Sequence, residues 1–324
     1  MSIISNCTAS AIKAAAKSLV DGNLVVFPTE TVYGLGADAC NEKAVARIYE
    51  AKGRPPNHPL IVHISSIAHL DEWARDIPEY ALKLARNFWP GPMTLILPRT
   101  KLAKDFITGS QDNVGLRVPE HTVALTLLRE FEALGGLGVA APSANKFGKV
   151  SPTSARDVID ELGDRLLDVD QVLEGGISQV GIESTIIDCT GENPIILRPG
   201  AITYKMIKNL VLSEVRQEHL SSNKLRAPGM LQSHYQPNAN VVLSGEVKSG
   251  DGFIALNTQA TPIGAIRLAS PRNNSEYAQI LYKALRLADS KNIKNVFVVA
   301  PHGDDIAIAI QDRLQKCSTK INKR

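Results

Sequence analysis

Apolar positions in the first two thirds of the chain alternate between helical spacing and short continuous runs. Residues 9–21 carry apolar side chains three and four positions apart and precede Gly22, which predicts a helix with a glycine cap. The run LVVF at 24–27 predicts a buried strand, and Asn41 is a suitable N-cap for a helix over 42–52. The same patterns predict a helix over 78–89 and strands over 60–64, 93–97, 114–118, 138–141, 184–188 and 195–197.

This alternation over residues 1–203 predicts an α/β domain with a twisted, mixed sheet. Residues 204–237 break the pattern with polar residues, two prolines and a glycine, and we interpret them as a linker. Residues 238–324 resume it and predict a second, smaller Rossmann-like α/β domain. Its expected strands are 241–243, 253–256, 265–269 and 295–300, and its expected helices cover 277–288 and 304–314.

The linker is long for a connection, since ordinary connections have about 4–6 residues. Its early part is polar and favours a disordered tether. Its end places Met230, Leu231, His234 and Tyr235 within a few residues, which favours a lid that docks over a binding site. The sequence leaves both interpretations open.

The composition is typical of soluble globular proteins. Hydrophobic residues make up 44% and charged residues 21% of the chain, and no stretch approaches the roughly 20 apolar residues of a membrane span. The N-terminus lacks the charged start and continuous apolar block of a signal peptide. Cys7, Cys40, Cys189 and Cys317 lie far apart, which argues against a zinc site or disulfide framework and favours a cytoplasmic location. The net charge of +3 neither requires nor excludes a nucleic-acid partner.

The segment PTETVYGLGADA (28–39) contains a loose dinucleotide pattern, GxGxxA. The pattern starts too far from the preceding strand for a Rossmann turn, and no acidic residue ends the next strand. We interpret 28–39 as a loop that lines a cleft with the hydroxyls of Thr29, Thr31 and Tyr33, or as a turn that only fills space.

Three further features supply positive charge and polar groups. Lys52 and Arg54 in KGRP can converge on a triphosphate, or can be a solvated turn at a helix C-terminus. Arg117 and Arg198 stand alone in apolar strands, so each needs an acidic partner or a bound anion.

The segment APSANKFGKVSPT offers Ser143, Asn145, Ser151 and open backbone N–H groups to phosphates, or is an ordinary N-cap loop. It is not a P-loop, because Lys149 is followed by Val150. The chain contains no HExxH metal motif and no GxSxG nucleophile elbow. The residues therefore indicate a cleft for an anionic nucleotide.

Taken in order, these motifs resemble the Sua5/YrdC family of threonylcarbamoyl-AMP synthases. The resemblance rests on PTETVYGLGADA, AKGRP, PLIVHI, PGPMTLIL, VGLRVPEH, APSANKFGKVSPT, ESTIID and LRPGAI, and it continues through APGMLQSHYQP into the second domain. It implies the long two-domain form, with an open cleft in the YrdC-like domain. The sequence departs from the family at His58, where asparagine is common, and at Gln232 and Ser233, where lysine is common.

The resemblance also implies roles for individual residues. A catalytic tetrad around the ATP phosphates would be Lys52, Arg54, Ser143 and Asn145. Threonine would be held by Thr31, His63, Arg117, Ala141 and Ser184. The nucleotide would be bound by Arg54, His58, Asn113, Ser143, Ser151, Arg198 and Tyr235.

The implied reaction joins L-threonine and bicarbonate as a carbamate, which then attacks the α-phosphorus of ATP and releases pyrophosphate. Magnesium would arrive with the nucleotide. The product would pass to a threonylcarbamoyl transferase for tRNA modification, and direct tRNA contact stays open. A non-catalytic RNA-binding module and a nicotinamide-dependent oxidoreductase are the alternatives, although aromatic residues, at 5%, are scarce for an RNA-stacking surface.

Overall fold

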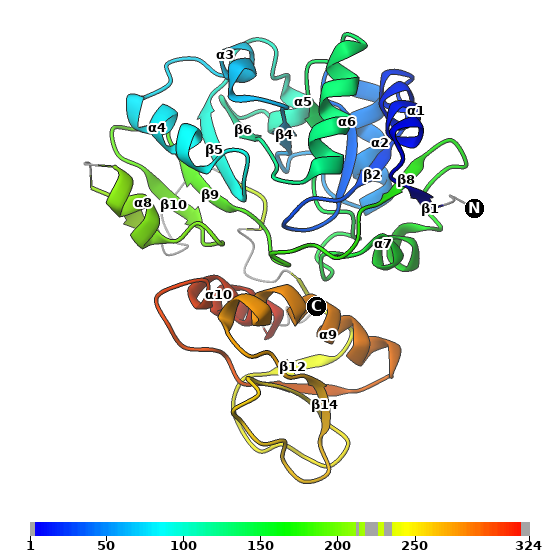
Figure 1. Ribbon diagram of the computed structural model, residues 1–324, viewed down its shortest axis with the longest axis vertical. Helices are drawn as coiled ribbons and strands as arrows, with labels where there is room; N and C mark the ends of the chain where they lie inside the picture. The colour runs from blue at the N-terminus through cyan, green and yellow to red at the C-terminus, as the bar shows by residue number, and fades with distance from the viewer. Residues whose placement is uncertain (1–3, 212–213, 218–225, 230–234, 319–324) are drawn as a thin grey trace.

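The computed structural model contains two α/β bodies, a larger first domain and a smaller second domain, as Figure 1 shows. The structure describes residues 4–211, 214–217, 226–229 and 235–318. The predicted α/β class and the two-domain organisation are confirmed. No helix in these ranges is long and apolar enough to cross a membrane.

The first domain is built on one mixed sheet with the strand order β1-β8-β2-β3-β7-β4-β6-β5-β9-β10-β11. Neighbouring strands run parallel in β1/β8, β4/β6 and β5/β9 and antiparallel in β2/β3, β4/β7 and β5/β6. The strands are β1 Ile4–Asn6, β2 Val25–Phe27, β3 Gly34–Asp38, β4 Ile61–His63, β5 Met93–Pro98, β6 Asn113–Arg117, β7 Val139–Ala140, β8 Gln171–Glu174, β9 Thr185–Asp188, β10 Ile195–Arg198 and β11 Arg216–Gln217.

Helices surround this sheet, and local sequence determines where they begin and end. The Asn41 side chain accepts a hydrogen bond from the Ala44 N–H and caps the helix that follows, as predicted, and Gly53 ends that helix in the left-handed region at φ 61°. Ser154 and Asp157 form a reciprocal capping box. The helices are α1 Ala9–Val20, α2 Glu42–Lys52, α3 Leu70–Trp73 after the short 3₁₀ turn Ile67–His69, α4 Glu79–Phe88, α5 Asp105–Thr108, α6 Thr122–Ala133, α7 Ala155–Leu162 and α8 Tyr204–Leu210.

The interpretation of residues 28–39 as a loop is wrong for residues 34–38, which form β3 between β2 and β7. Glycine is needed at Gly36 for close packing, because a Cβ there would lie 2.8 Å from both Phe27 and Val139. The GxGxxA pattern therefore covers strand β3 and Ala39 directly after it, and it forms no strand-to-helix turn for a dinucleotide.

Part of the expected linker belongs structurally to the first domain. Helix α8 buries Ile207 completely, and Val211 and Val215 join the same hydrophobic core. Strand β11 pairs with β10. The first domain thus includes residues up to Gln217.

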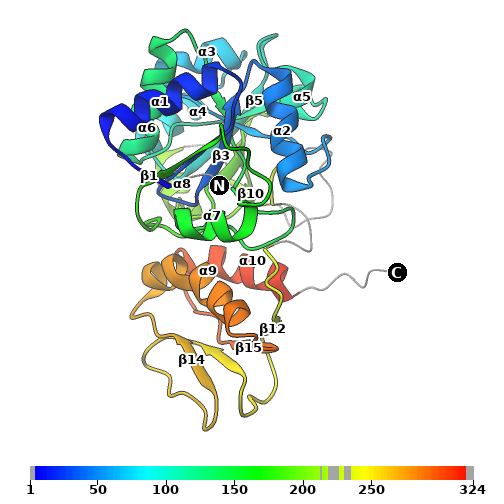
Figure 2. The ribbon, with the colours of Figure 1, turned by 90° about the vertical axis from the view of Figure 1, so that its right-hand side faces the viewer.

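The second domain has a four-stranded parallel sheet in the order β12-β15-β13-β14 and two helices. Figures 1 and 2 show both helices between this sheet and the first domain. The elements are β12 Asn240–Val242, β13 Gly252–Ile254, β14 Ile266–Ala269, α9 Asn274–Ser290, β15 Asn295–Val298 and α10 Ala307–Ser318.

Candidate functional site

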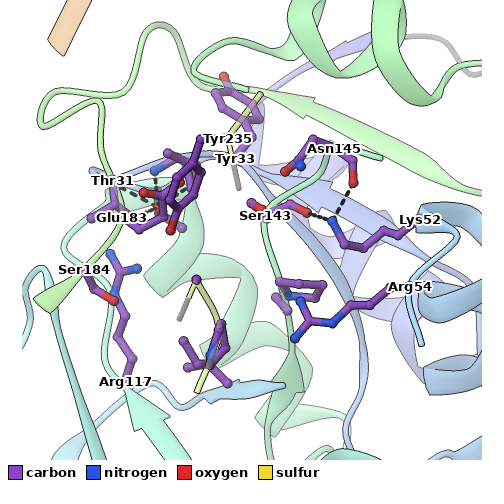
Figure 3. A pocket seen from close by; sticks show the side chains of 18 of the residues that line it. Thr31, Tyr33, Lys52, Arg54, Arg117, Ser143, Asn145, Glu183, Ser184 and Tyr235 are labelled. Atoms are coloured by element: carbon purple, nitrogen blue, oxygen red, sulfur yellow. Dashed lines mark hydrogen bonds between the residues drawn. The ribbon is translucent and has the colours of Figure 1, made fainter. Parts of the chain in front are cut away.

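A cavity opens in the first domain beside the second domain, and most of the predicted site residues line it (Figure 3). Its empty volume is about 690 Å³, which includes open solvent at its mouth. The predicted residues on its wall are Thr31, Lys52, Arg54, His63, Arg117, Ala141, Ser143, Asn145, Ser184, Arg198 and Tyr235.

Three predicted nucleotide residues lie just outside this wall. His58 packs edge-on against Phe147, with ring centroids 5.3 Å apart. Asn113 lines a smaller adjoining pocket, which also contacts Pro228. The Ser151 hydroxyl is buried and donates to the Glu183 carboxylate at 2.6 Å.

Lys52 holds the loop that carries Ser143 and Asn145. Its Nζ donates to the Ser143 carbonyl at 2.6 Å and also to the Asn145 carbonyl, and its own carbonyl accepts from the Phe147 N–H at 2.8 Å. Burial, reinforced by the nearby Arg54 charge, lowers the pKa of Lys52 well below its usual value. Much of its hydrogen-bonding capacity therefore maintains the shape of the loop.

Arg54 is the cation that is most available to a ligand. Gly53 turns the chain at the end of α2, so that Arg54 leaves the helix axis and lines the cavity. One guanidinium nitrogen donates to the Pro59 carbonyl at 2.8 Å, and the buried Nε has no hydrogen-bond partner among the described residues. Burial lowers the pKa of Arg54 to about 10, so the side chain remains charged at neutral pH. A buried cation with an unused donor is suited to bind a phosphate.

His63 is a neutral group in the cavity wall. Its ring meets the Phe27 ring edge-on at 5.9 Å, and its Nδ1 has no partner within the described part of the chain. Burial, followed by the Arg117 charge, lowers the pKa of His63 from 6.5 to about 3.

This shift predicts that stability depends on pH through His63. The unfolded chain takes up a proton at His63 as the pH falls below 6.5, but the folded protein does not until about pH 3, so folding loses free energy in that window. Between pH 6.5 and 5 the loss should be about 2 kcal/mol, at roughly 1.4 kcal/mol per pH unit for one group. Urea unfolding of the wild type and His63→Gln at pH 7, 6 and 5 measures it, and the other histidines cancel in the comparison. Equal pH slopes for the two proteins would contradict this prediction.

Arg117 both forms an ion pair and lines the cavity, so the structure combines the two alternatives that the sequence left open. Its Nη2 lies 2.6 Å from the Glu30 carboxylate, and its Nε donates to the Gly91 carbonyl at 3.3 Å. Arg198 differs, because it donates to the Ser184 carbonyl and hydroxyl, each at 3.0 Å.

The second domain supports one wall of the cavity through its contacts with Glu183 of the first domain. The Glu183 carboxylate accepts hydrogen bonds from Arg313 Nε at 2.8 Å and from the Tyr282 hydroxyl at 3.0 Å, in addition to the bond from Ser151. Burial alone would raise the pKa of Glu183, but Arg313, Arg198 and the Ser151 hydrogen bond lower it to about 2. Glu183 is therefore ionised and locked in place.

Tyr235 lies between two side chains of the second domain. Its ring stacks on Tyr282, with centroids 5.9 Å apart, and the Arg313 guanidinium sits 5.3 Å from its centroid on the ring face. Glu30, Glu183 and Arg313 were not predicted as site residues from the sequence. The two glutamates lie inside motifs that were noted, but Arg313 sits in an ordinary amphipathic helix and gives no signal.

The short segment 226–229 is anchored beside the cavity from both domains. Gln111 makes two hydrogen bonds to the Arg226 backbone, at 2.6 and 3.0 Å. The Pro228 carbonyl accepts from Arg198 at 3.0 Å, and the Gly229 carbonyl accepts from Lys316 at 2.8 Å. The other residues expected in the lid, Met230, Leu231 and His234, lie outside the described residues.

The described residues contain no group of three or more His, Cys, Asp or Glu side chains that could hold a metal ion. Glu183, the one carboxylate among the described residues of the cavity wall, is already engaged by Ser151, Tyr282 and Arg313. The donor set therefore fits a metal ion that arrives with a ligand's phosphates better than one held by the protein alone.

Comparison with known proteins covers both domains. Residues 17–200 match the Sua5_yciO_yrdC family model, described as telomere recombination, and residues 202–319 match the model described as the C-terminal domain of threonylcarbamoyl-AMP synthase. A threonylcarbamoyl-AMP synthase of Pyrococcus abyssi is 38% identical over 95% of this chain and 94% of that protein. One of Bacillus subtilis is 37% identical over 95% and 92%. The crystal structure of P. abyssi Sua5 complexed with L-threonine shares 36% identity and a TM-score of 0.88 over 98% of each chain.

Proposed function

The chain belongs to the Sua5/YrdC family, in its long two-domain form, and from this membership we propose how its cavity forms threonylcarbamoyl-AMP. The chain is a threonylcarbamoyl-AMP synthase, and we assign it to the nucleotidyltransferases because the reaction transfers AMP from ATP. The observation that carries the assignment of the cavity is its set of buried cations, Lys52, Arg54, Arg117 and Arg198.

These cations divide the cavity into two ends. Figure 3 shows Lys52 and Arg54 on one side, with Ser143 and Asn145, and Arg117 on the other. We assign the first side to the ATP phosphates, where Arg54 donates directly and Lys52 shapes the loop. His58, Asn113, Ser151, Arg198 and Tyr235 would enclose the rest of the nucleotide.

The opposite side would hold L-threonine. Arg117 would receive its carboxylate, while Thr31, His63, Ala141 and Ser184 would surround the remaining atoms. Bicarbonate would meet the threonine amine between the two ends, where the resulting carbamate oxygen faces the α-phosphorus. The chain's contribution is to align these reactants, exclude water and neutralise developing charge, with no covalent enzyme intermediate. Magnesium would be bound through the ATP phosphates and would offset their charge.

We further propose that the product passes to a threonylcarbamoyl transferase acting on tRNA. A cytoplasmic location is consistent with Cys7, Cys40, Cys189 and Cys317, which are all free thiols.

Pyrophosphate release should require threonine and bicarbonate together. Serine should react at least about ten-fold more slowly, because one missing methyl group costs about 1–3 kcal/mol of discrimination. A coupled pyrophosphate assay with each substrate omitted in turn measures this requirement. Equal release with serine, or without bicarbonate, would rule out the proposed substrates.

A further inference from the structure

We propose that Glu30 is a positioning residue that reserves Arg117 for the carboxylate of a zwitterionic amino acid and excludes phosphate from that end of the cavity. This inference rests on the proposed function, in which Arg117 binds threonine. Arg117 touches the ligand in this assignment, and Glu30 acts through it, because the Glu30 side chain pairs with Arg117 behind the cavity wall.

Glu30 is held rigidly on the far side of Arg117. Its side chain is 3% exposed and that of Arg117 is 5% exposed, with 2.6 Å between carboxylate and guanidinium. The other Glu30 oxygen accepts the Glu120 N–H at 3.0 Å, and the Glu30 carbonyl accepts the Val180 N–H at 2.7 Å. Side chain and backbone are thus both fixed, so the guanidinium plane is fixed with them.

The pairing leaves a defined part of Arg117 for a ligand. Nε donates to the Gly91 carbonyl and Nη2 to Glu30. No described residue accepts a hydrogen bond from Nη1, and Arg117 lines the cavity. One edge of the guanidinium can therefore meet a carboxylate without rearrangement.

The charge around Arg117 differs from that at the other end of the cavity. Among the described residues, Lys52, Arg54 and Arg198 donate only to carbonyl and hydroxyl oxygens, so none of them is paired directly with a carboxylate, although the Glu183 charge partly offsets that of Arg198. Arg117 is balanced by Glu30, and the adjacent His63 is neutral because burial lowers its pKa to about 3. A polyanion is favoured at the unbalanced end, and a zwitterion without net charge is favoured beside the pair.

Glu30 would also favour threonine over phosphate at the Arg117 end, because its negative charge repels a polyanion. An arginine alone in a buried site binds phosphate as readily as carboxylate, since both match its planar fork. The fixed negative charge of Glu30 penalises a multiply charged phosphate more than a threonine, whose ammonium group offsets its carboxylate. Without Glu30, the products of ATP turnover could occupy the threonine end.

The test is Glu30→Gln, which keeps the size and an acceptor oxygen but removes the charge. Asp170→Asn is the matched control, because Asp170 is also a buried carboxylate of the first domain, paired with Arg47 at 2.6 Å, and does not line the cavity. We expect Glu30→Gln to raise the KM for threonine at least about ten-fold, equivalent to roughly 1.4 kcal/mol, with little change in the KM for ATP. Inorganic phosphate should become a competitive inhibitor against threonine. Asp170→Asn should lower the melting temperature but leave both KM values unchanged.

The other possible results would contradict either the role proposed for Glu30 or the assignment of Arg117 to the threonine end of the cavity. If Arg117→Ala raises the KM for threonine and Glu30→Gln does not, the role of Glu30 is wrong while the proposed function stands. If Arg117→Ala also leaves the KM for threonine unchanged, the assignment of the threonine end fails. Equal increases in both KM values for Glu30→Gln would make Glu30 merely structural. Should Glu30→Gln fail to fold, Glu30→Asp retains the charge, and competition by phosphate against threonine in that variant would refute the inference.

Discussion

Replacing Arg54 with alanine should lower the rate of threonylcarbamoyl-AMP formation by about 100-fold or more. A hydrogen bond from a charged group contributes about 1.5–3 kcal/mol, and a guanidinium can donate two to one phosphate. The fold should tolerate the change, because the only described partner of the Arg54 side chain is the Pro59 carbonyl. Removal of the Arg54 guanidinium also relieves its electrostatic repulsion with the neighbouring Lys52 ammonium group. Steady-state turnover and the melting temperature without ATP measure the two effects separately.

Two variants act as references for this experiment. Lys52→Ala should also lose activity, but with a lower melting temperature, because the carbonyls of Ser143 and Asn145 lose their donor. Arg129→Ala removes an exposed arginine from α6 and should change neither measurement. The solvated turn that the sequence left open for KGRP is already excluded, because both cations are buried, and normal turnover by Arg54→Ala would give Arg54 a structural role only.

Tyr235→Ala should reduce product formation by at least about ten-fold, and so should removal of everything after Gln217. We propose that Tyr235 closes the nucleotide side of the cavity and helps to exclude water from two intermediates that hydrolyse readily. Tyr235 is 1% exposed and is held between Tyr282 and Arg313, so its loss would leave that wall unsupported. A chain ending at Gln217 keeps α8 and β11, which belong to the first domain.

The control for Tyr235→Ala is Tyr277→Ala, which removes an equally buried tyrosine from the core of the second domain. Tyr277 does not line the cavity, so this variant should lose stability without a matching loss of product at temperatures where it stays folded. Full activity in the shortened chain would show that the second domain and its connection are only a tether.

Local sequence signals predicted much of the fold, and tertiary contacts account for what they missed. The N-cap of the helix over 42–52 was predicted correctly, because Asn41 acts through neighbours in the chain. Strand β3 was mistaken for a loop, because Gly34 and Gly36 are typical of turns until Phe27 and Val139 pack against them.

For the site, too, residues in local sequence motifs were predictable, and residues that matter only through tertiary contacts were not. Motif residues such as Arg54, Ser143 and Arg117 were identified from chain order and do line one cavity. Arg313 could not be found this way, since its significance arises from contact with Glu183, 130 positions earlier in the chain. Only the folded arrangement shows that the second domain supports the cavity wall from behind, through Glu183.

The pairing of β1 with β8 has a consequence for how this protein is made on the ribosome. Asn6 is aligned with Glu174, 168 positions later in the chain (174 − 6), so β1 finds its partner only after all of the intervening residues have been synthesised. At about 5–20 residues per second, the strand waits for roughly ten to thirty seconds with its backbone groups unpaired. Strand β2 waits for the same partner, β8. The nascent chain therefore exposes an open sheet edge until β8 has been made, a period in which association with other chains or capture by a chaperone is favoured.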